Sequence, residues 1–157
     1  MIYSRSSQYA IRAMTHLTAH ANGSLCRLET IAKCENIPQH FLAKIMQRLG
    51  KKRLVKSSKG IKGGFALSTP PEQTTLYIIV EAIDDVSLLF SECILGHGTC
   101  SEEQHCPLHD SWKELRARQI DFLKGITLAD MAAAGQTGHN RLAAESITPS
   151  SNMTRFS

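Results

Sequence analysis

The sequence predicts a mainly α-helical fold that carries one small β-hairpin. Apolar residues recur every three or four positions in several separate segments, which is the spacing of one face of an α-helix. Residues 54–58 and 64–68 have the composition of short strands and flank a turn of glycine and lysine, as in a β-hairpin. Because the chain has 157 residues, we expect one core with extensions and not two domains of ordinary size.

The N-terminal segment predicts two helices and a tight turn. An amphipathic helix is expected over residues 5–20, with Ser4 as its N-cap. Its apolar positions are Ala10, Ile11, Met14 and Leu17. A shorter helix runs to about Glu35 and ends before Asn36, a residue type that tolerates the left-handed backbone of a tight turn.

A third helix is expected to start with Pro38, since proline is favoured at the first helical position. Its apolar face, which we expect to be buried, consists of Phe41, Leu42, Ile45, Met46 and Leu49. Its polar and basic outer face consists of Gln39, His40, Ala43, Lys44, Gln47 and Arg48. Two short helices around a four-residue turn, the second with such a face, match a helix-turn-helix. The hairpin that follows makes it a winged helix.

Positive charge is concentrated in the first part of the chain. Residues 1–70 contain twelve Lys and Arg against two acids, for a net charge of +10, whereas residues 71–157 contain six against twelve, for −6. The densest stretch holds seven bases and no acid: Arg48, Lys51, Lys52, Arg53, Lys56, Lys59 and Lys62. Glycines interleave with these bases, which weakens the alternative that the stretch is only the solvated face of a helix. We therefore expect residues 1–70 to bind a polyanion, and the winged helix makes double-stranded DNA the expected partner.

The next region, residues 71–134, predicts a helix, a loop and a longer helix. The two prolines that follow the hairpin end it, because proline cannot continue a strand ladder. A helix then follows, with apolar positions Leu76, Ile79, Val80 and Ile83, and stops near Asp84. Residues 86–107 are loop-like.

A long helix is expected from Leu108, and every third or fourth residue along it forms a seam for packing on another helix. The seam positions are Leu108, Trp112, Leu115, Gln119 and Phe122. Gly125 fits the C′ position, and residues 127–130 resemble a capping box for a last helix through about Ala134. We expect the seam to pair with a second copy in a homodimer, the alternative being packing within one subunit. Residues 135–157 are polar and without periodicity, which predicts a disordered tail.

Cys93, Cys100, Cys106 and His109 form a candidate metal site on the predicted loop. Thiolates and imidazole suit both zinc and iron-sulfur clusters, so ligand type leaves both open. Structural zinc sites usually pair cysteines two to four residues apart, whereas these cysteines have six and five residues between them, which suits a centre larger than one ion. The alternative is that these are surface or core cysteines that bind no metal. The remaining Cys26 and Cys34 are interpreted as small half-buried residues of the N-terminal helices.

Several classes of protein are disfavoured. No apolar run approaches the roughly 18 residues of a membrane span, and no secretory signal opens the chain, so we expect a cytoplasmic protein without a membrane partner. There is no Cys-x-x-Cys, phosphate loop or readable nucleophile–base pair, so enzymatic activity, thiol redox catalysis included, is not expected.

An ordered set of motifs resembles the IscR and NsrR type of winged-helix transcription regulators, also called the Rrf-two family. The motifs are Arg5-x3-Tyr9-Ala10, residues 37–49, Lys59-Gly60-x2-Gly63-Gly64-Phe65, Cys106-Pro107-Leu108-His109 and Thr127-Leu128-Ala129-Asp130. The resemblance covers residues 1 to about 134. It implies a homodimeric repressor or dual regulator that binds a palindromic operator and holds an iron-sulfur cluster through its three clustered cysteines.

The resemblance also implies a fourth ligand. In the IscR-like branch a histidine two residues beyond the last cysteine completes a 2Fe-2S cluster, and His109 occupies that place. In the NsrR-like branch an acidic residue near the N-terminus completes a 4Fe-4S cluster across the dimer. The matching position here is Gln8, which favours the 2Fe-2S reading. The chain departs from the family in the Cys93–Cys100 interval, which is one residue longer than the usual five.

By the same resemblance, the DNA contacts fall on the third helix and the wing. Base contacts are expected from Gln39, His40, Ala43 and Lys44, whose chemistry suits adenine, guanine and thymine edges. Phosphate contacts are expected from Arg5, Arg48, Lys51, Lys59 and Lys62, which makes affinity depend on salt. At the wing tip, Ile61 and Lys62 replace the family's common Pro-Gly. The physiological signal stays open among cluster supply, iron, nitric oxide and redox stress.

Overall fold

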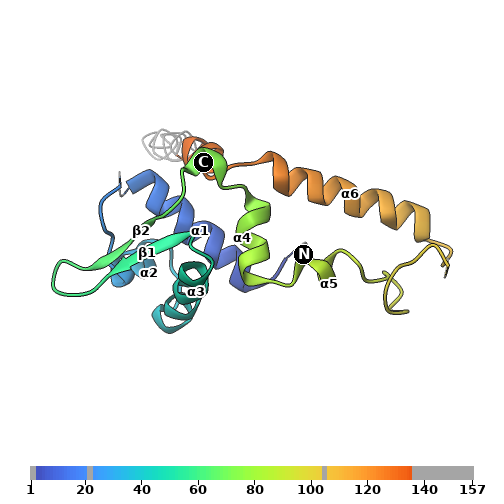
Figure 1. Ribbon diagram of the computed structural model, residues 1–157, viewed down its shortest axis with the longest axis horizontal. Coiled ribbons are helices and arrows are strands. Elements are labelled where there is room, and N and C mark those ends of the chain that lie inside the picture. Colours follow the sequence, from blue (N-terminus) through green and yellow to red (C-terminus); the bar gives the residue numbers. More distant parts are fainter. Residues whose placement is uncertain (1–2, 21–22, 104–105, 136–157) are drawn as a thin grey trace, which may run out of the picture.

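The computed structural model describes residues 3–20, 23–103 and 106–135 (Figure 1). In chain order the helices and strands are α1 (Arg5–His20), α2 (Leu28–Cys34), α3 (Gln39–Lys51), β1 (Val55–Ser58), β2 (Gly64–Leu67), α4 (Leu76–Ile83), α5 (Val86–Leu89) and α6 (His109–Gly125). A 3-10 turn, Pro71–Gln73, precedes α4, and residues 128–135 are again helical. The fold is therefore mainly helical with a two-stranded antiparallel hairpin, as predicted. The disordered tail was predicted over residues 135–157, and all of these except Gly135 lie outside the described residues.

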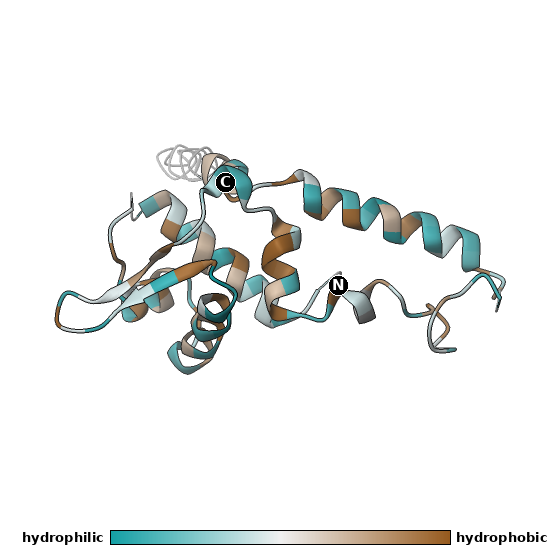
Figure 2. Ribbon diagram, viewed as in Figure 1, coloured by the Kyte–Doolittle hydropathy of each residue, from teal (hydrophilic) through white to brown (hydrophobic). Residues whose placement is uncertain are grey.

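The chain builds a packed body from α1 to α4 and the hairpin, and α6 extends from this body as a long arm (Figure 1). The chain leaves the body through α4 and α5 and returns along α6, so that residues 128–135 lie again beside the body. Apolar residues concentrate in the helices of the body, whereas α6 is mostly hydrophilic with separate apolar positions (Figure 2). Met14, Leu42, Leu49 and Ile79 are among the completely buried core side chains.

The start of α1 is tied to the end of α4. Ser4 caps α1, since its hydroxyl oxygen accepts the Ser7 backbone N–H at 3.2 Å, which confirms the predicted N-cap. Asp84 accepts the Ser4 backbone N–H at 2.9 Å and both hydroxyls, from Ser4 at 2.7 Å and from Ser7 at 2.9 Å. The carboxylate thereby satisfies donors at a helix N-terminus, where negative charge is favoured.

The predicted helix-turn-helix is present as α2, a tight turn and α3. Asn36 has φ 48°, the left-handed conformation expected of it, and the Ile37 backbone N–H donates to the Ala32 carbonyl at 2.9 Å. Pro38 is the N-cap of α3 and not its first helical residue. The prediction that Phe41 is buried is wrong, because 49% of it is exposed. It lies at the edge of the apolar face, and its ring packs on that of His40 at 4.3 Å between centroids.

The wing is an antiparallel hairpin in which Val55 pairs with Leu67 and Ser58 with Gly64. A third strand-like segment joins it: Cys26 and Phe65 exchange two backbone hydrogen bonds of 2.8 Å. Gly64 is required at this contact, because a Cβ there would lie 2.5 Å from the Cys26 carbonyl oxygen. The two remaining cysteines thus differ from the prediction in part. Cys26 is half-buried but lies before α2, and Cys34 is exposed.

The segment after α6 packs back on the start of α4. The Leu76 backbone N–H donates to the Ile126 carbonyl and the Leu128 backbone N–H to the Thr74 carbonyl, both at 2.9 Å. The predicted capping box is confirmed: the Asp130 carboxylate accepts the Thr127 backbone N–H at 2.9 Å, and the Asp130 backbone N–H donates to the Thr127 hydroxyl at 3.2 Å. The Thr127 hydroxyl also donates to this carboxylate at 2.7 Å, and this bond, followed by the one from the Thr127 backbone N–H, holds the pKa of Asp130 below its usual value.

Two local predictions about this region are wrong. Residues 86–107 are not wholly loop-like, because α5 occupies Val86–Leu89. Gly125 is not a left-handed C′ residue; it is the last residue of α6, and Ile126 leaves the helix with an extended backbone. The chain can therefore turn back toward α4 without a glycine in the left-handed region.

Candidate nucleic-acid interface and metal site

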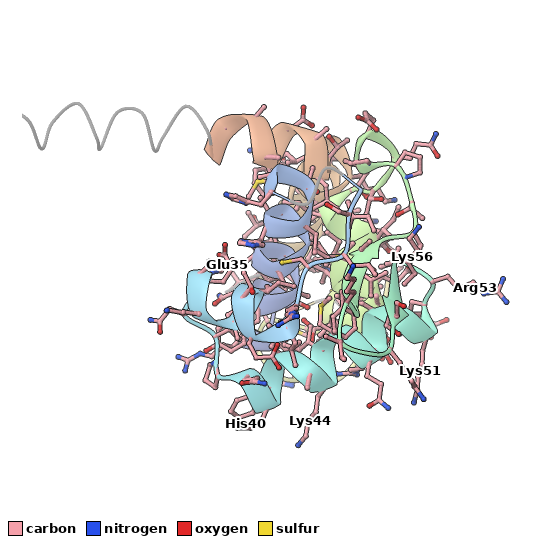
Figure 3. All side chains as sticks on the ribbon, turned by 90° about the vertical axis from the view of Figure 1, so that its left-hand side faces the viewer. Glu35, His40, Lys44, Lys51, Arg53 and Lys56 are labelled. Atoms are coloured by element: carbon pink, nitrogen blue, oxygen red, sulfur yellow. The ribbon has the colours of Figure 1, made fainter. Side chains whose placement is uncertain are left out.

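The outer face of α3 is an exposed polar and basic surface, as predicted. We call it the recognition face, and it consists of Gln39, His40, Ala43, Lys44, Gln47, Arg48 and Lys51, all exposed. It faces outward because Leu42, Ile45, Met46 and Leu49 bury the opposite side of the helix. His40, Lys44 and Lys51 project from α3 away from the body of the protein (Figure 3).

The first turn of the recognition face is partly ordered by contacts inside the protein. The Gln39 side-chain amide donates to the Glu29 carboxylate of α2 at 3.2 Å. This leaves the Gln39 carbonyl oxygen as an acceptor on the same face. Lys44, one turn further along α3, is exposed and forms the basic centre of the surface.

The remaining predicted contact residues are also exposed. Lys59 and Lys62 lie in the turn of the wing, and Arg5 is the first residue of α1. No acidic residue occurs between Glu35 and Glu72, so positive charge predominates on the recognition face and the wing. Such a surface attracts a polyanion, and the counterions condensed on the polyanion are released when the two bind.

The loop that carries the cysteines is folded by backbone hydrogen bonds. Gly96 and Gly98 have φ of 75° and 85°, so both occupy the left-handed region that glycine adopts without strain. The Cys93 backbone N–H donates to the Gly98 carbonyl at 2.7 Å, and the Cys100 backbone N–H donates to the Ser91 carbonyl at 2.6 Å. The loop therefore doubles back and places Cys93 and Cys100 on neighbouring backbone segments.

The four predicted ligands form two pairs. The sulfurs of Cys93 and Cys106 are 3.8 Å apart, and the Cys100 sulfur is 3.2 Å from Nδ1 of His109. Cys93 and His109 are buried, while the other two are half-buried. In residues 3–20, 23–103 and 106–135, no three His, Cys, Asp or Glu side chains converge as ligands of a single metal ion.

The donor set fits a thiophilic metal centre. Two thiolates bound to one tetrahedral metal at about 2.3 Å have their sulfurs roughly 3.8 Å apart, which is the separation of Cys93 and Cys106. A backbone hydrogen bond from Leu95 is the main cause that lowers the pKa of Cys93, and a second from His97, the Cys106 thiol and the positive charge of Arg116 act in the same direction against burial. The lowered pKa shifts the equilibrium of Cys93 from the thiol toward the thiolate, which is the form that binds metal.

Acidic and basic residues of the loop and α6 surround His109. Its Nε2 is 3.6 Å from the Glu102 carboxylate, which also pairs with Lys113 one turn along α6. Glu102 raises the pKa of Lys113, chiefly through their hydrogen bond. A carboxylate behind a ligating imidazole orients the ring and increases its basicity. The sequence prediction missed Glu102, although its acid type and its place between the last two cysteines were visible.

Two further side chains that the prediction missed as site residues hold α6 against the loop. Arg116 is buried, and its guanidinium donates to the Phe90 carbonyl at 2.7 Å. The indole N–H of Trp112 donates to the Glu92 carbonyl at 2.9 Å, and Arg116 lies over the Trp112 ring at 6.0 Å. Trp112 therefore packs in part within its own subunit, contrary to a purely intermolecular seam. No pattern in the sequence distinguishes Arg116 from the exposed bases of a helix.

The apolar residues of the rest of the predicted seam are exposed, while Gln119 is half-buried. Leu108, Leu115 and Phe122 have 45%, 46% and 52% of their surface accessible, whereas the adjacent Leu123 is fully buried. Leucine and phenylalanine side chains spaced along one helix and open to solvent form an unpartnered apolar stripe on α6. Among the described residues, no helix is long and apolar enough to cross a membrane.

The chain is similar to known transcription regulators over most of its length. It is 38% identical over 133 residues to a putative HTH-type transcriptional regulator of Aquifex aeolicus, covering 83% of this chain and 91% of the relative. It is 30% identical over 124 residues to the HTH-type transcriptional regulator IscR of Vibrio vulnificus, covering 79% of this chain and 73% of the relative.

Solved structures show the same fold. CymR of B. subtilis, described as the global cysteine regulator, matches with a TM-score of 0.72 and 24% identity over 83% of this chain and 95% of its own. IscR of T. potens matches with a TM-score of 0.68 and 23% identity over 84% of this chain and 86% of its own. The family model Rrf2, iron-dependent transcriptional regulator, matches residues 3–134. This chain therefore belongs to the Rrf2 family and is a DNA-binding transcriptional regulator.

Proposed function

We propose that this protein is an iron-sulfur-sensing regulator, most simply a repressor, that binds a palindromic operator as a homodimer. The observation that carries the proposal is the pairing of Cys93 with Cys106 and of Cys100 with His109 beside a long exposed helix. A 2Fe-2S cluster has two irons with two protein ligands each, so two donor pairs match it better than one convergent set of four. Gln8, which has no carboxylate to offer, supports the same cluster type over 4Fe-4S.

The homodimer is supported by the apolar stripe on α6. Leu115 and Phe122 are half exposed on an arm that extends from the body, where a second copy of α6 would cover them (Figure 1). A two-fold dimer presents two recognition faces. It then reads two half-sites about 34 Å apart, or a multiple of that spacing, which makes the operator palindromic. Because such a protein acts on chromosomal DNA, its proposed location is the cytoplasm.

Coupling between the loop and DNA is attributed to α6. Trp112 and Arg116 hold α6 to the backbone of residues 90–92, immediately before Cys93. A change at the cysteines therefore reaches the helix that sets the distance between two recognition faces. Regulation follows if the two states of the loop differ in their affinity for DNA.

The proposal is tested by purifying the protein without oxygen and measuring iron, acid-labile sulfide, zinc and visible absorption. Two irons and two sulfides per subunit, with visible absorption bands, are expected. His109→Ala should shift these bands because it removes a neutral imidazole, while Cys93→Ser should abolish them because it removes a thiolate, the ligand type that iron-sulfur clusters select. Operator affinity measured on the same samples should change with Cys93→Ser.

The alternative is a structural zinc site without a sensing role. The sulfur separation of Cys93 and Cys106 fits zinc as well as iron. A colourless protein with one zinc per subunit, whose operator affinity is insensitive to air, would refute the sensor and support this alternative.

A further inference from the structure

The turn of the wing displays an isoleucine between two lysines. Ile61 is 90% exposed, the largest exposure among the exposed large apolar side chains of the described residues. Lys59 and Lys62 are also exposed. Residues 59–63 form the turn between β1 and β2, and this turn extends away from the body of the protein (Figure 1).

The turn that carries Ile61 is built and held in place. The Gly63 backbone N–H donates to the Gly60 carbonyl at 2.9 Å, and Gly60 has φ 102°. A Cβ at Gly63 would lie 2.3 Å from the Ser58 carbonyl oxygen, so the turn closes with no room for a side chain. The Arg27 guanidinium, from the N-cap of α2, donates to the Ile61 carbonyl at 2.7 Å. The apolar side chain is therefore presented by a fixed backbone.

The charge around Ile61 indicates the chemical class of the partner that would cover this side chain. A partner that covers this exposed isoleucine removes its apolar surface from water, which favours binding. The flanking lysines disfavour a cationic or purely apolar partner and favour a polyanion, and α3 with its recognition face packs beside the same hairpin. When a recognition helix occupies the major groove, the wing beside it reaches toward the adjacent minor groove.

We propose that Ile61 is a specificity-determining residue that contacts the floor of the DNA minor groove, with Lys59 and Lys62 on the flanking phosphates, and selects A·T base pairs there. This rests on the proposed operator binding. A·T pairs lack the guanine amino group in the minor groove, so an apolar side chain can approach their floor without burying an unpaired donor.

The test uses the full chain and a library of random duplex DNA. Sequences bound by the wild type are selected, and the affinity for the best duplex is compared with that of a duplex whose flanking A·T pairs are changed to G·C. Wild type should favour the A·T duplex, and Ile61→Ala should lose roughly five- to tenfold in affinity for it with little change on the G·C duplex. The salt dependence of binding should be unchanged by Ile61→Ala.

Two comparison variants separate the apolar contact from charge. Lys62→Ala should weaken both duplexes alike and reduce the slope of log affinity against log salt by about one. Ile61→Ser, which removes the apolar side chain without adding charge, should lose the A·T preference as Ile61→Ala does. Ile61→Leu keeps an apolar side chain of the same size at the same place, so it serves as the matched control and should keep the A·T preference.

The outcomes are distinct. An A·T preference that survives both Ile61→Ala and Ile61→Ser would overturn the role of Ile61 while leaving operator binding intact. A wild-type protein that selects no sequence at all would instead overturn the proposed function, and the role of Ile61 with it.

Discussion

The body and the α6 arm are stabilised in different ways, and the difference separates the residues that hold the fold from those to which we attribute regulation. In the body, α1, α3 and α4 share one core, with side chains such as Met14, Leu49 and Ile79 fully buried. The arm has few such residues: His109, Arg116 and Leu123 are buried, and apolar Leu115 and Phe122 remain open. The arm is held by a few polar contacts, so changes there can alter geometry without unfolding the body.

The largest effect is expected from the core of the body. Leu49→Ala removes a fully buried side chain from the inner face of α3 and should lower the free energy of unfolding by about 2–5 kcal/mol. Urea denaturation followed by circular dichroism measures it. Leu115→Ala, the same truncation on the exposed stripe, is the matched control, and both variants are measured at concentrations where the protein is monomeric. If both lowered the free energy of unfolding equally, the contrast between body and arm would be wrong.

The next effect concerns assembly and not folding. Phe122→Asp places a charge on the exposed apolar stripe of α6, where a second copy would bury it without a partner. The dimer dissociation constant should rise more than tenfold, while the circular dichroism spectrum keeps its helical signal. Sedimentation velocity over a range of concentrations measures this. A monomeric wild type, or an unchanged dimer in the variant, would show that the stripe serves another contact.

A smaller effect is expected where the arm meets the loop. Arg116→Ala removes the donor to the Phe90 carbonyl and should reduce stability by about 1–3 kcal/mol. Hydrogen exchange should localise the loss to residues 86–100 and α6 and leave α1 to α4 protected. Arg116→Lys keeps the charge and serves as the comparison. Uniform loss of protection across the chain would argue that body and arm unfold as one unit.

The smallest effect is pH-dependent. The hydrogen bonds from Thr127 lower the pKa of Asp130 in the folded state, so this aspartate stabilises the fold above its ordinary unfolded pKa. That contribution is lost as pH falls through the lowered folded pKa. Asp130→Asn should therefore lower the melting temperature slightly at neutral pH and have no effect in strong acid. A difference that grows toward acid pH would reverse the sign and exclude this capping role.

The local elements were largely predictable because their signals are local. Helical spacing placed α1, α3 and α4, Asn36 marked the turn, and the capping box after α6 was visible in four residues. Phe41 was misplaced because an apolar residue at the edge of a helical face is buried only if another element covers it. The exposure of that ring depends on which elements pack beside α3, and sequence spacing does not encode this.

The candidate site was predictable in residue type and not in arrangement. Three cysteines and a histidine on one loop indicated metal chemistry, but spacing alone does not show that Cys93 faces Cys106 or that Cys100 faces His109. That pairing comes from the left-handed turns at Gly96 and Gly98 and from where α6 begins. Arg116 was unpredictable for a related reason, since a buried arginine and an exposed one look alike in a helical sequence.

By itself the sequence determined the mainly helical class and the basic winged helix-turn-helix, because these follow from local spacing, turn chemistry and charge, and it placed three cysteines and a histidine close together in the chain. The tertiary structure decided which side chains meet: Asp84 at the start of α1, Arg116 beneath the loop, the two ligand pairs, and an isoleucine left at the wing tip. Those outcomes depend on contacts between residues distant in the chain, whose distances are set only when all the elements pack together.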